Sequence, residues 1–219
     1  MGEANVRRYC AMGGFAFVVL GLISTAISGS PPAANDPPRE ILEYFQDSEG
    51  AIRLASYLSV LGIFFLLFWL GNLWATLRRA EGGVPLLTVV AGLGAVVGAA
   101  GAGTSFAVTS MIALRTGSIG DTGAAVFYLL SFTLLGAAGV GIAALVLATS
   151  LIVLRTSVFP RWIGAFGLVL TVAWLVAAAA IATDKEFVGL FGLISFVLWA
   201  IWILAISVVM LRGPEPAVA

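Results

Sequence analysis

Six long apolar segments alternate with short polar connectors along this chain, and the charged residues fall in the connectors or near the ends. A hydrocarbon core about 30 Å thick is crossed by about 20 helical residues, whose backbone groups must bond within the helix because no water is present. The pattern therefore predicts an all-α, polytopic transmembrane helix bundle that forms one domain over residues 1–219. The six predicted spans run approximately over residues 9–28, 54–77, 84–113, 124–154, 161–183 and 187–211.

Composition excludes the obvious alternative, a soluble helix bundle. Hydrophobic residues make up 61% of the chain and charged residues 10%, whereas soluble domains average about 45–50% and about 25%. A soluble bundle would also give each helix a polar face, and these segments have none. The lipid bilayer is therefore the expected partner, and the longer segments 84–113 and 124–154 are expected to tilt or to project from it.

The basic residues predict the orientation, because Lys and Arg are enriched in the cytoplasmic loops of membrane proteins. With both termini in the cytoplasm, the inner set is Arg7, Arg8, Arg78, Arg79, Arg155, Arg161 and Arg212, and the outer set is Arg39, Arg53, Arg115 and Lys185. The outer connectors also carry most of the acidic residues, namely Asp36, Glu40, Glu43, Asp47, Glu49, Asp121, Asp184 and Glu186. The predicted outer face is therefore negative.

The first segment also has features of a secretory signal. Arg7 and Arg8 precede an apolar stretch that ends in Ala26-Ile27-Ser28, a small-residue pattern typical of a cleavage site. The apolar stretch is long for a signal, and its removal would leave five spans with the termini on opposite sides. A retained span is therefore the favoured interpretation.

The first outer connector predicts a short amphipathic helix at the membrane interface. Asp36 is the expected N-cap, with Pro37 at the first helical position. Apolar and acidic residues then fall on opposite faces: Ile41, Leu42, Tyr44 and Phe45 against Glu40, Glu43 and Asp47. This helix is either a surface cap, with its carboxylates simply solvated, or a lid over an outward-facing cavity.

Small residues predict where helices pack closely. Gly94 and Gly98 lie one turn apart in the third segment, and Gly136, Gly139 and Gly141 follow in the fourth. Small residues let helix backbones approach in a membrane, and we expect these two segments to pack on each other within one chain rather than across a dimer. Asn72, the most polar side chain in the second segment, is expected to bond to a neighbouring helix.

The sequence offers little for catalysis or metal binding. It has no histidine and a single cysteine, Cys10, and histidine is the usual haem ligand, metal ligand and general base. Ion-coupled transporters carry ionisable residues inside the bundle, and the segment interiors have none. We therefore expect no cofactor, no metal site and no catalytic residue. With 11 basic and 11 acidic residues, the chain also shows no basic surplus for nucleic acid.

Hydroxyl groups gather toward the outer ends of three segments. These candidate ligand-binding residues are Tyr57, Thr104, Ser105, Thr109, Tyr128 and Ser131. Ser105 and Thr109 lie about one turn apart, as do Tyr128 and Ser131, so each pair can share a helix face. Each hydroxyl either bonds to a carbonyl of its own helix or faces a cavity, and the predicted helix around Tyr44 is placed to cover that end.

The layout resembles an uncharacterised family of six-helix integral membrane proteins common in actinobacteria. The resemblance rests on the Pro160-Arg161-Trp162-Ile163-Gly164 start of the fifth segment and on Glu40-Ile41-Leu42-Glu43-Tyr44-Phe45 in the Pro-rich outer connector. It covers nearly the whole chain and implies a multi-pass protein of the bacterial plasma membrane. It supplies no activity and no catalytic residues.

Three classes of function stay open. We favour a non-enzymatic accessory or structural membrane subunit, with another membrane protein as its candidate partner and an undetermined oligomeric state. The first alternative is a module that binds or passively transports a small, largely apolar or neutral solute through an outward-facing pocket, similar in size to the substrate-binding subunits of vitamin importers. The second alternative is an enzyme that modifies lipid at the outer interface.

Overall fold

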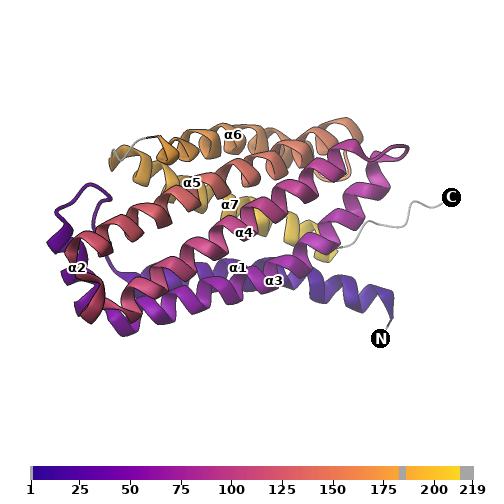
Figure 1. Ribbon diagram of the computed structural model, residues 1–219. Helices are drawn as coiled ribbons and strands as arrows, with labels where there is room; N and C mark the ends of the chain where they lie inside the picture. Colours follow the sequence, from indigo (N-terminus) through magenta and orange to yellow (C-terminus); the bar gives the residue numbers. More distant parts are fainter. Residues whose placement is uncertain (1, 183–185, 213–219) are drawn as a thin grey trace.

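The chain is a bundle of helices (Figure 1). The computed structural model describes residues 2–182 and 186–212, and within them it contains no strand. The helices are α1 (Glu3–Ser28), α2 (Pro38–Asp47), α3 (Glu49–Glu81), α4 (Leu86–Leu114), α5 (Thr116–Thr156), α6 (Arg161–Ala177), the 3₁₀ helix η1 (Ala178–Ile181) and α7 (Glu186–Arg212). Asp184 and Lys185, assigned above to the outer side, lie outside the described residues.

The long helices form a ring. Going around it, α1 packs on α3, α3 on α4, α4 on α5, α5 on α6, α6 on α7, and α7 on α1. Helix α2 lies across one end of the ring and packs mainly on α5, while α1 begins and α7 ends at the opposite end (Figure 1). The two ends are called here the α2 end and the opposite end.

Five of the described helices, α1, α3, α4, α5 and α7, are long and apolar enough to cross a membrane. This confirms a helical bundle of the membrane type. The predicted segment 161–183 is less regular than expected, because its α-helix spans only 17 residues and ends at Ala177. The chain then tightens into the four-residue 3₁₀ helix η1, a common way for a helix to end.

Several helices extend beyond the predicted spans, and two of the differing starts depend on a proline and a glycine. Helix α2 begins one residue late, because Pro38 disfavours a helical conformation at the preceding residue and holds Pro37 extended at ψ 136°. Asp36 is therefore not the N-cap, and its carboxylate accepts a bond from the Ala33 amide at 2.7 Å. Helix α5 begins eight residues before residue 124, with a kink at Gly120, whose φ of 68° favours glycine.

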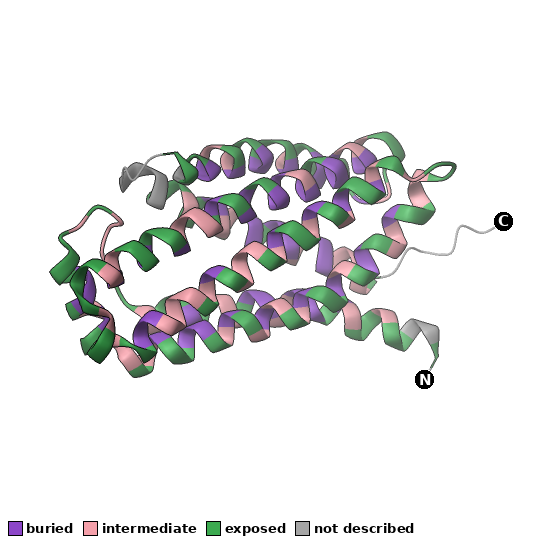
Figure 2. Cartoon of the chain, in the orientation of Figure 1, coloured by how far each residue is buried: buried purple, intermediate pink, exposed green. Residues whose placement is uncertain are grey.

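The part of the bundle nearest the opposite end is filled by large side chains. Trp69 and Trp202 are fully buried and lie edge to face with ring centroids 6.3 Å apart. The Trp69 indole donates to Ser207 Oγ at 2.8 Å, and the Trp202 indole donates to the Ile163 carbonyl at 3.1 Å. Buried residues face the interior of the ring and exposed apolar residues face outward (Figure 2), which suits a bundle surrounded by lipid.

Helices α4 and α5 are in close backbone contact. A Cβ atom at Gly94 would lie 2.5 Å from the Gly141 carbonyl oxygen, and one at Gly98 would lie 2.9 Å from the Ile142 side chain. Gly139 does not take part, because it faces α6. Gly136 is also buried on α5.

Asn72 bonds across the interface between two helices. Its amide Nδ2 on α3 donates to the Arg7 backbone carbonyl on α1 at 3.1 Å. This confirms the expectation that the most polar side chain of the second segment finds its partner on a neighbouring helix.

Candidate ligand pocket

A pocket with about 170 Å³ of accessible space lies directly beneath α2 and is partly open to the outside. Helices α1, α3, α4 and α5 form its walls, and α2 with the preceding loop forms its roof. The described residues that line it are Ser24, Ser28, Pro31, Tyr44, Phe45, Ile52, Ala55, Ser56, Ser59, Ser105, Phe106, Thr109, Tyr128, Ser131, Phe132 and Leu135. None of these carries a formal charge, so the lining consists of hydroxyl groups, aromatic rings and aliphatic side chains.

Four of the six candidate residues from the sequence come together in this cavity. Ser105 and Thr109 of α4 and Tyr128 and Ser131 of α5 lie side by side in its lining. The other two do not contribute. Tyr57 is 64% exposed on the outside of α3, and an exposed Thr104 donates its hydroxyl proton to the Ala100 carbonyl of its own helix.

Hydroxyl bonds join the α4 and α5 walls. Ser105 Oγ donates to the Ser131 carbonyl at 2.8 Å, which crosses from one helix to the other. Ser131 Oγ donates to the Tyr128 carbonyl at 2.7 Å, and Thr109 Oγ1 donates to the Ser105 carbonyl at 3.0 Å. These bonds fix the rotamers of three lining side chains, so this wall of the pocket is preformed.

The opposite wall is built by serines of α1 and α3. Ser24 Oγ donates to the Ala55 carbonyl at 2.9 Å and also lies 2.8 Å from Ser59 Oγ. Ser28 Oγ donates to the Ser24 carbonyl at 3.0 Å. The sequence analysis missed this wall, although Ser24 and Ser28 are spaced i, i+4 and Ser56 and Ser59 are spaced i, i+3, so each pair shares a helix face.

Two tyrosines hold the roof in place. Tyr44 on α2 donates its hydroxyl proton to the Ser28 carbonyl, and Tyr128 on α5 donates to the Pro32 carbonyl, both at 2.8 Å. Phe45 lies edge to face with both rings, at 5.3 Å from Tyr44 and 5.5 Å from Tyr128. Burial raises the pKa of Tyr44 above its ordinary value, so the bond to Ser28 persists at neutral pH.

The amphipathic character of α2 explains its position. Its buried residues are Ile41, Leu42 and Phe45, which pack with Ile52, Ile112 and Tyr128 of the bundle. Its other face carries an exposed ion pair between Arg39 and Glu43, with the nitrogen and oxygen 2.7 Å apart. The apolar face of α2 is therefore turned onto the bundle, over the cavity.

An aromatic cluster lies deeper in the bundle than the pocket, between α1, α6 and α7. Phe17 on α1 lies edge to face with Trp199 on α7 at 5.2 Å, and Trp199 lies edge to face with Trp174 on α6 at 5.8 Å. Phe17 also contacts Gly62, which lies about one turn from the lining residue Ser59. Through Phe17 the cluster therefore reaches α3 about one turn from the pocket lining.

A second hollow, of about 400 Å³, lies between α3 and α4 nearer the opposite end. Its lining is apolar and includes Trp74, Gly92, Leu93 and Val96, of which Trp74, Leu93 and Val96 are exposed. It is a groove on the outside of the ring, and it lacks the hydroxyl groups that line the cavity under α2.

No group of three or more His, Cys, Asp or Glu side chains that could hold a metal ion occurs among the described residues.

Comparison of the chain with models of protein families, with curated proteins and with solved structures found no match. The resemblance inferred from the sequence therefore stays a prediction, and the pocket is the structural feature that bears on function.

Proposed function

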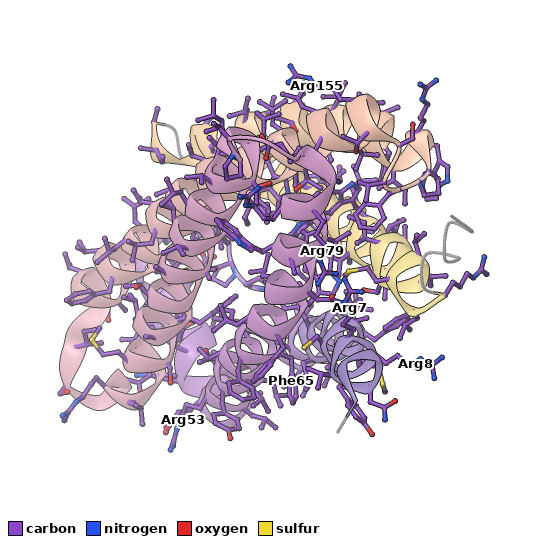
Figure 3. All side chains as sticks on the ribbon, turned by 90° about the vertical axis from the view of Figure 1, so that its right-hand side faces the viewer. Arg7, Arg8, Arg53, Phe65, Arg79 and Arg155 are labelled. Atoms are coloured by element: carbon purple, nitrogen blue, oxygen red, sulfur yellow. The ribbon has the colours of Figure 1, made fainter. Side chains whose placement is uncertain are left out.

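We propose that the chain is a six-span protein of the bacterial plasma membrane with both termini in the cytoplasm. Two observations support this topology. Helix α1 begins and α7 ends at the end of the bundle opposite α2 (Figure 1). Arg7 and Arg8 lie near the start of α1, and Arg79 and Arg155 lie in the last turns of α3 and α5, which also end on that side, the side that faces the viewer in Figure 3. The sixth span is α6 continued by η1 over residues 161–181, which is about the length that a bilayer requires. The α2 end is then the outer end.

Within this topology, the protein binds a small, uncharged, largely apolar molecule in the cavity beneath α2. The observation that carries the proposal is the contrast between the two halves of the ring: tryptophans fill the inner half, whereas serines line a hollow of about 170 Å³ in the outer half. An engineered protein cavity of about 150 Å³ binds benzene, so the volume suits a ligand of that size. The lining carries no charge to pair with an ion.

A variant that fills the cavity tests this proposal. Ser56 lines the cavity and is buried, but it makes no hydrogen bond with any described residue, so Ser56→Phe fills the hollow without breaking a bond. Ala107→Phe is the matched control, because Ala107 lies on the exposed face of α4. Ligand-observed NMR with small aromatic probes should detect binding to the wild type and to the control, with loss of binding in Ser56→Phe. Equal binding by both variants would place the probes outside the cavity and contradict the proposal.

An accessory membrane subunit is the second candidate, and the groove between α3 and α4 supports it. The groove exposes Trp74, Leu93 and Val96 on the lipid-facing side, where another membrane helix could pack. Co-purification from native membranes tests this candidate. A protein that binds the wild type but not a Leu93→Arg variant would support it, and recovery of the chain without a stoichiometric companion would contradict it.

A further inference from the structure

Most hydroxyl groups of the pocket already use their proton in a hydrogen bond to another group of the protein. A serine, threonine or tyrosine hydroxyl has one proton to donate and two lone pairs to accept with. Every hydroxyl of the lining except those of Ser56 and Ser59 donates to a backbone carbonyl: Ser24 to Ala55, Ser28 to Ser24, Tyr44 to Ser28, Ser105 to Ser131, Thr109 to Ser105, Tyr128 to Pro32 and Ser131 to Tyr128. Their oxygens can then only accept.

The two remaining hydroxyls differ from each other. The single proton of Ser24 goes to the Ala55 carbonyl, so the 2.8 Å contact between Ser24 and Ser59 is a bond that Ser59 donates. Ser59 is therefore also left with acceptor lone pairs only. Ser56 has no bond to any described residue, which makes it the one lining hydroxyl with a free proton.

Unpaired polar groups exist elsewhere in the described part of the bundle, outside the lining. The indole nitrogens of Trp174 and Trp199 and the hydroxyls of Thr149 and Ser195 are buried without a hydrogen-bond partner among the described residues. None of these four residues lines the cavity, and the two tryptophans stack edge to face in the aromatic cluster beneath it. They do not change the balance of donors and acceptors in the pocket.

From this balance we infer that the pocket selects uncharged molecules that donate a hydrogen bond, of which small alcohols are the simplest class. This inference rests on the proposed function and specifies its ligand. A donor group on the ligand pairs with lone pairs that otherwise stay unused, and aromatic rings such as Phe45 and Phe106 enclose its apolar part. An ether of the same size can only accept a hydrogen bond, and Ser56 is the only donor that the described lining offers it.

Anions and cations, the two other classes of polar ligand, do not suit this lining because it carries no charge to pair with them. An anion would face oxygen lone pairs and have only the Ser56 proton to accept. An ammonium ion could donate to these oxygens, but the described lining offers no carboxylate to pair with it, and burying an unpaired charge is costly. The acidic residues Glu40 and Glu43 lie on the exposed face of α2, outside the cavity.

Two isomeric probes and two charged analogues test the inference. Benzyl alcohol and anisole have the same atoms, but only the alcohol donates a hydrogen bond. Binding to the purified protein in detergent should favour the alcohol by about fivefold, the gain typical of one additional hydrogen bond, and benzylammonium and benzoate should bind more weakly than either. Anisole is the more apolar isomer and partitions more strongly into micelles, so the two affinities are compared at equal free concentrations of the probes.

The variant Ser56→Ala identifies which hydroxyls act. It removes the only free donor without breaking a bond, so the preference for the alcohol should persist or increase. A ratio that falls to one in Ser56→Ala would mean that Ser56 alone makes the bond, and would overturn the acceptor assignment of the other hydroxyls. Equal binding of alcohol and ether to the wild type, or tighter binding of benzylammonium, would overturn the inference but leave the pocket. Failure of every probe to bind would overturn the proposed function as well.

Discussion

The contact between α4 and α5 makes a sharp prediction at Gly141. A Cβ atom added there would lie 2.6 Å from the Gly98 amide nitrogen and 2.7 Å from the Gly94 carbonyl oxygen. Both obstacles are backbone atoms of the partner helix, so no side chain can rotate away to make room. The substitution Gly141→Ala can be accommodated only if the two helices move apart.

The cost follows from the distances. Ordinary van der Waals contact begins near 3.4 Å, so the Cβ atom is about 0.8 Å too close. A gap of that size between packed helices forfeits about a quarter to a half of each contact energy along the interface, and overpacking of this kind typically costs about 1–3 kcal/mol. We therefore expect Gly141→Ala to lower the free energy of unfolding by about 2 kcal/mol.

Unfolding of the purified protein by titration from mild detergent into dodecyl sulfate measures this difference. Gly71→Ala is the matched control, because Gly71 is an exposed glycine in the middle of α3 with no atom within 4 Å of an added Cβ. Alanine is the better helix former by about 0.5–1 kcal/mol, so the control should be as stable as the wild type or slightly more stable. A Gly141→Ala protein as stable as the control would refute the close approach of α4 and α5.

Two further predictions concern the roof of the pocket and its response to pH. Tyr128→Phe removes the bond to the Pro32 carbonyl, so amide hydrogen exchange in the loop 29–36 should accelerate about fivefold, and an unchanged rate would show that this bond does not hold the loop. Alcohol affinity should be constant between about pH 5 and pH 9, because tyrosine is the only titratable residue type in the described lining. Burial raises the pKa of the Tyr44 hydroxyl in the folded state. The stability that the protonated hydroxyl contributes is therefore fully present below the ordinary tyrosine pKa of 10.0, and it is lost as the pH rises through the raised pKa. A change in affinity near pH 6 or 7 would contradict this lining.

The sequence predicted helices well because long apolar runs in a membrane leave the backbone no other choice. It predicted boundaries less well, because these depend on single residues. Pro38 shifts the start of α2 by one residue, and Gly120 adopts a positive φ that kinks α5 four residues after its start at Thr116. The sequence contains both residues, but their effect depends on the neighbouring structure.

The candidate site was also only partly predictable, because the direction in which each side chain points decides whether it lines the pocket. Neighbouring residues point about 100° apart around a helix, so Ser56 lines the cavity while Tyr57 is exposed. Gly139 and Gly141 likewise point in nearly opposite directions, the first toward α6 and the second toward α4. A single sequence shows which residues share a face but not which neighbour that face meets, which is why one wall of the pocket was predicted and the other was missed.

The cavity itself has an energetic consequence that separates a binding site from a packing defect. Residual cavity volume destabilises a protein by about 24 cal/mol per Å³, so about 170 Å³ of unfilled space has an upper limit of about 4 kcal/mol, and the cost is below this limit because the pocket is partly open. Ser56→Phe should recover part of this, about 1 kcal/mol, because it fills space and removes the one lining hydroxyl that has no partner.

We expect Ser56→Phe to be more stable in the dodecyl sulfate titration than the wild type, and yet to have lost the probes that the wild type binds. Stability gained at the expense of binding is the usual sign of a hollow kept for function. If Ser56→Phe is less stable than the wild type while Ala107→Phe is unchanged, the space beneath α2 is already occupied by well-bound water. The pocket would then be a hydrated part of the core, and this result would contradict the proposal that it binds a small molecule.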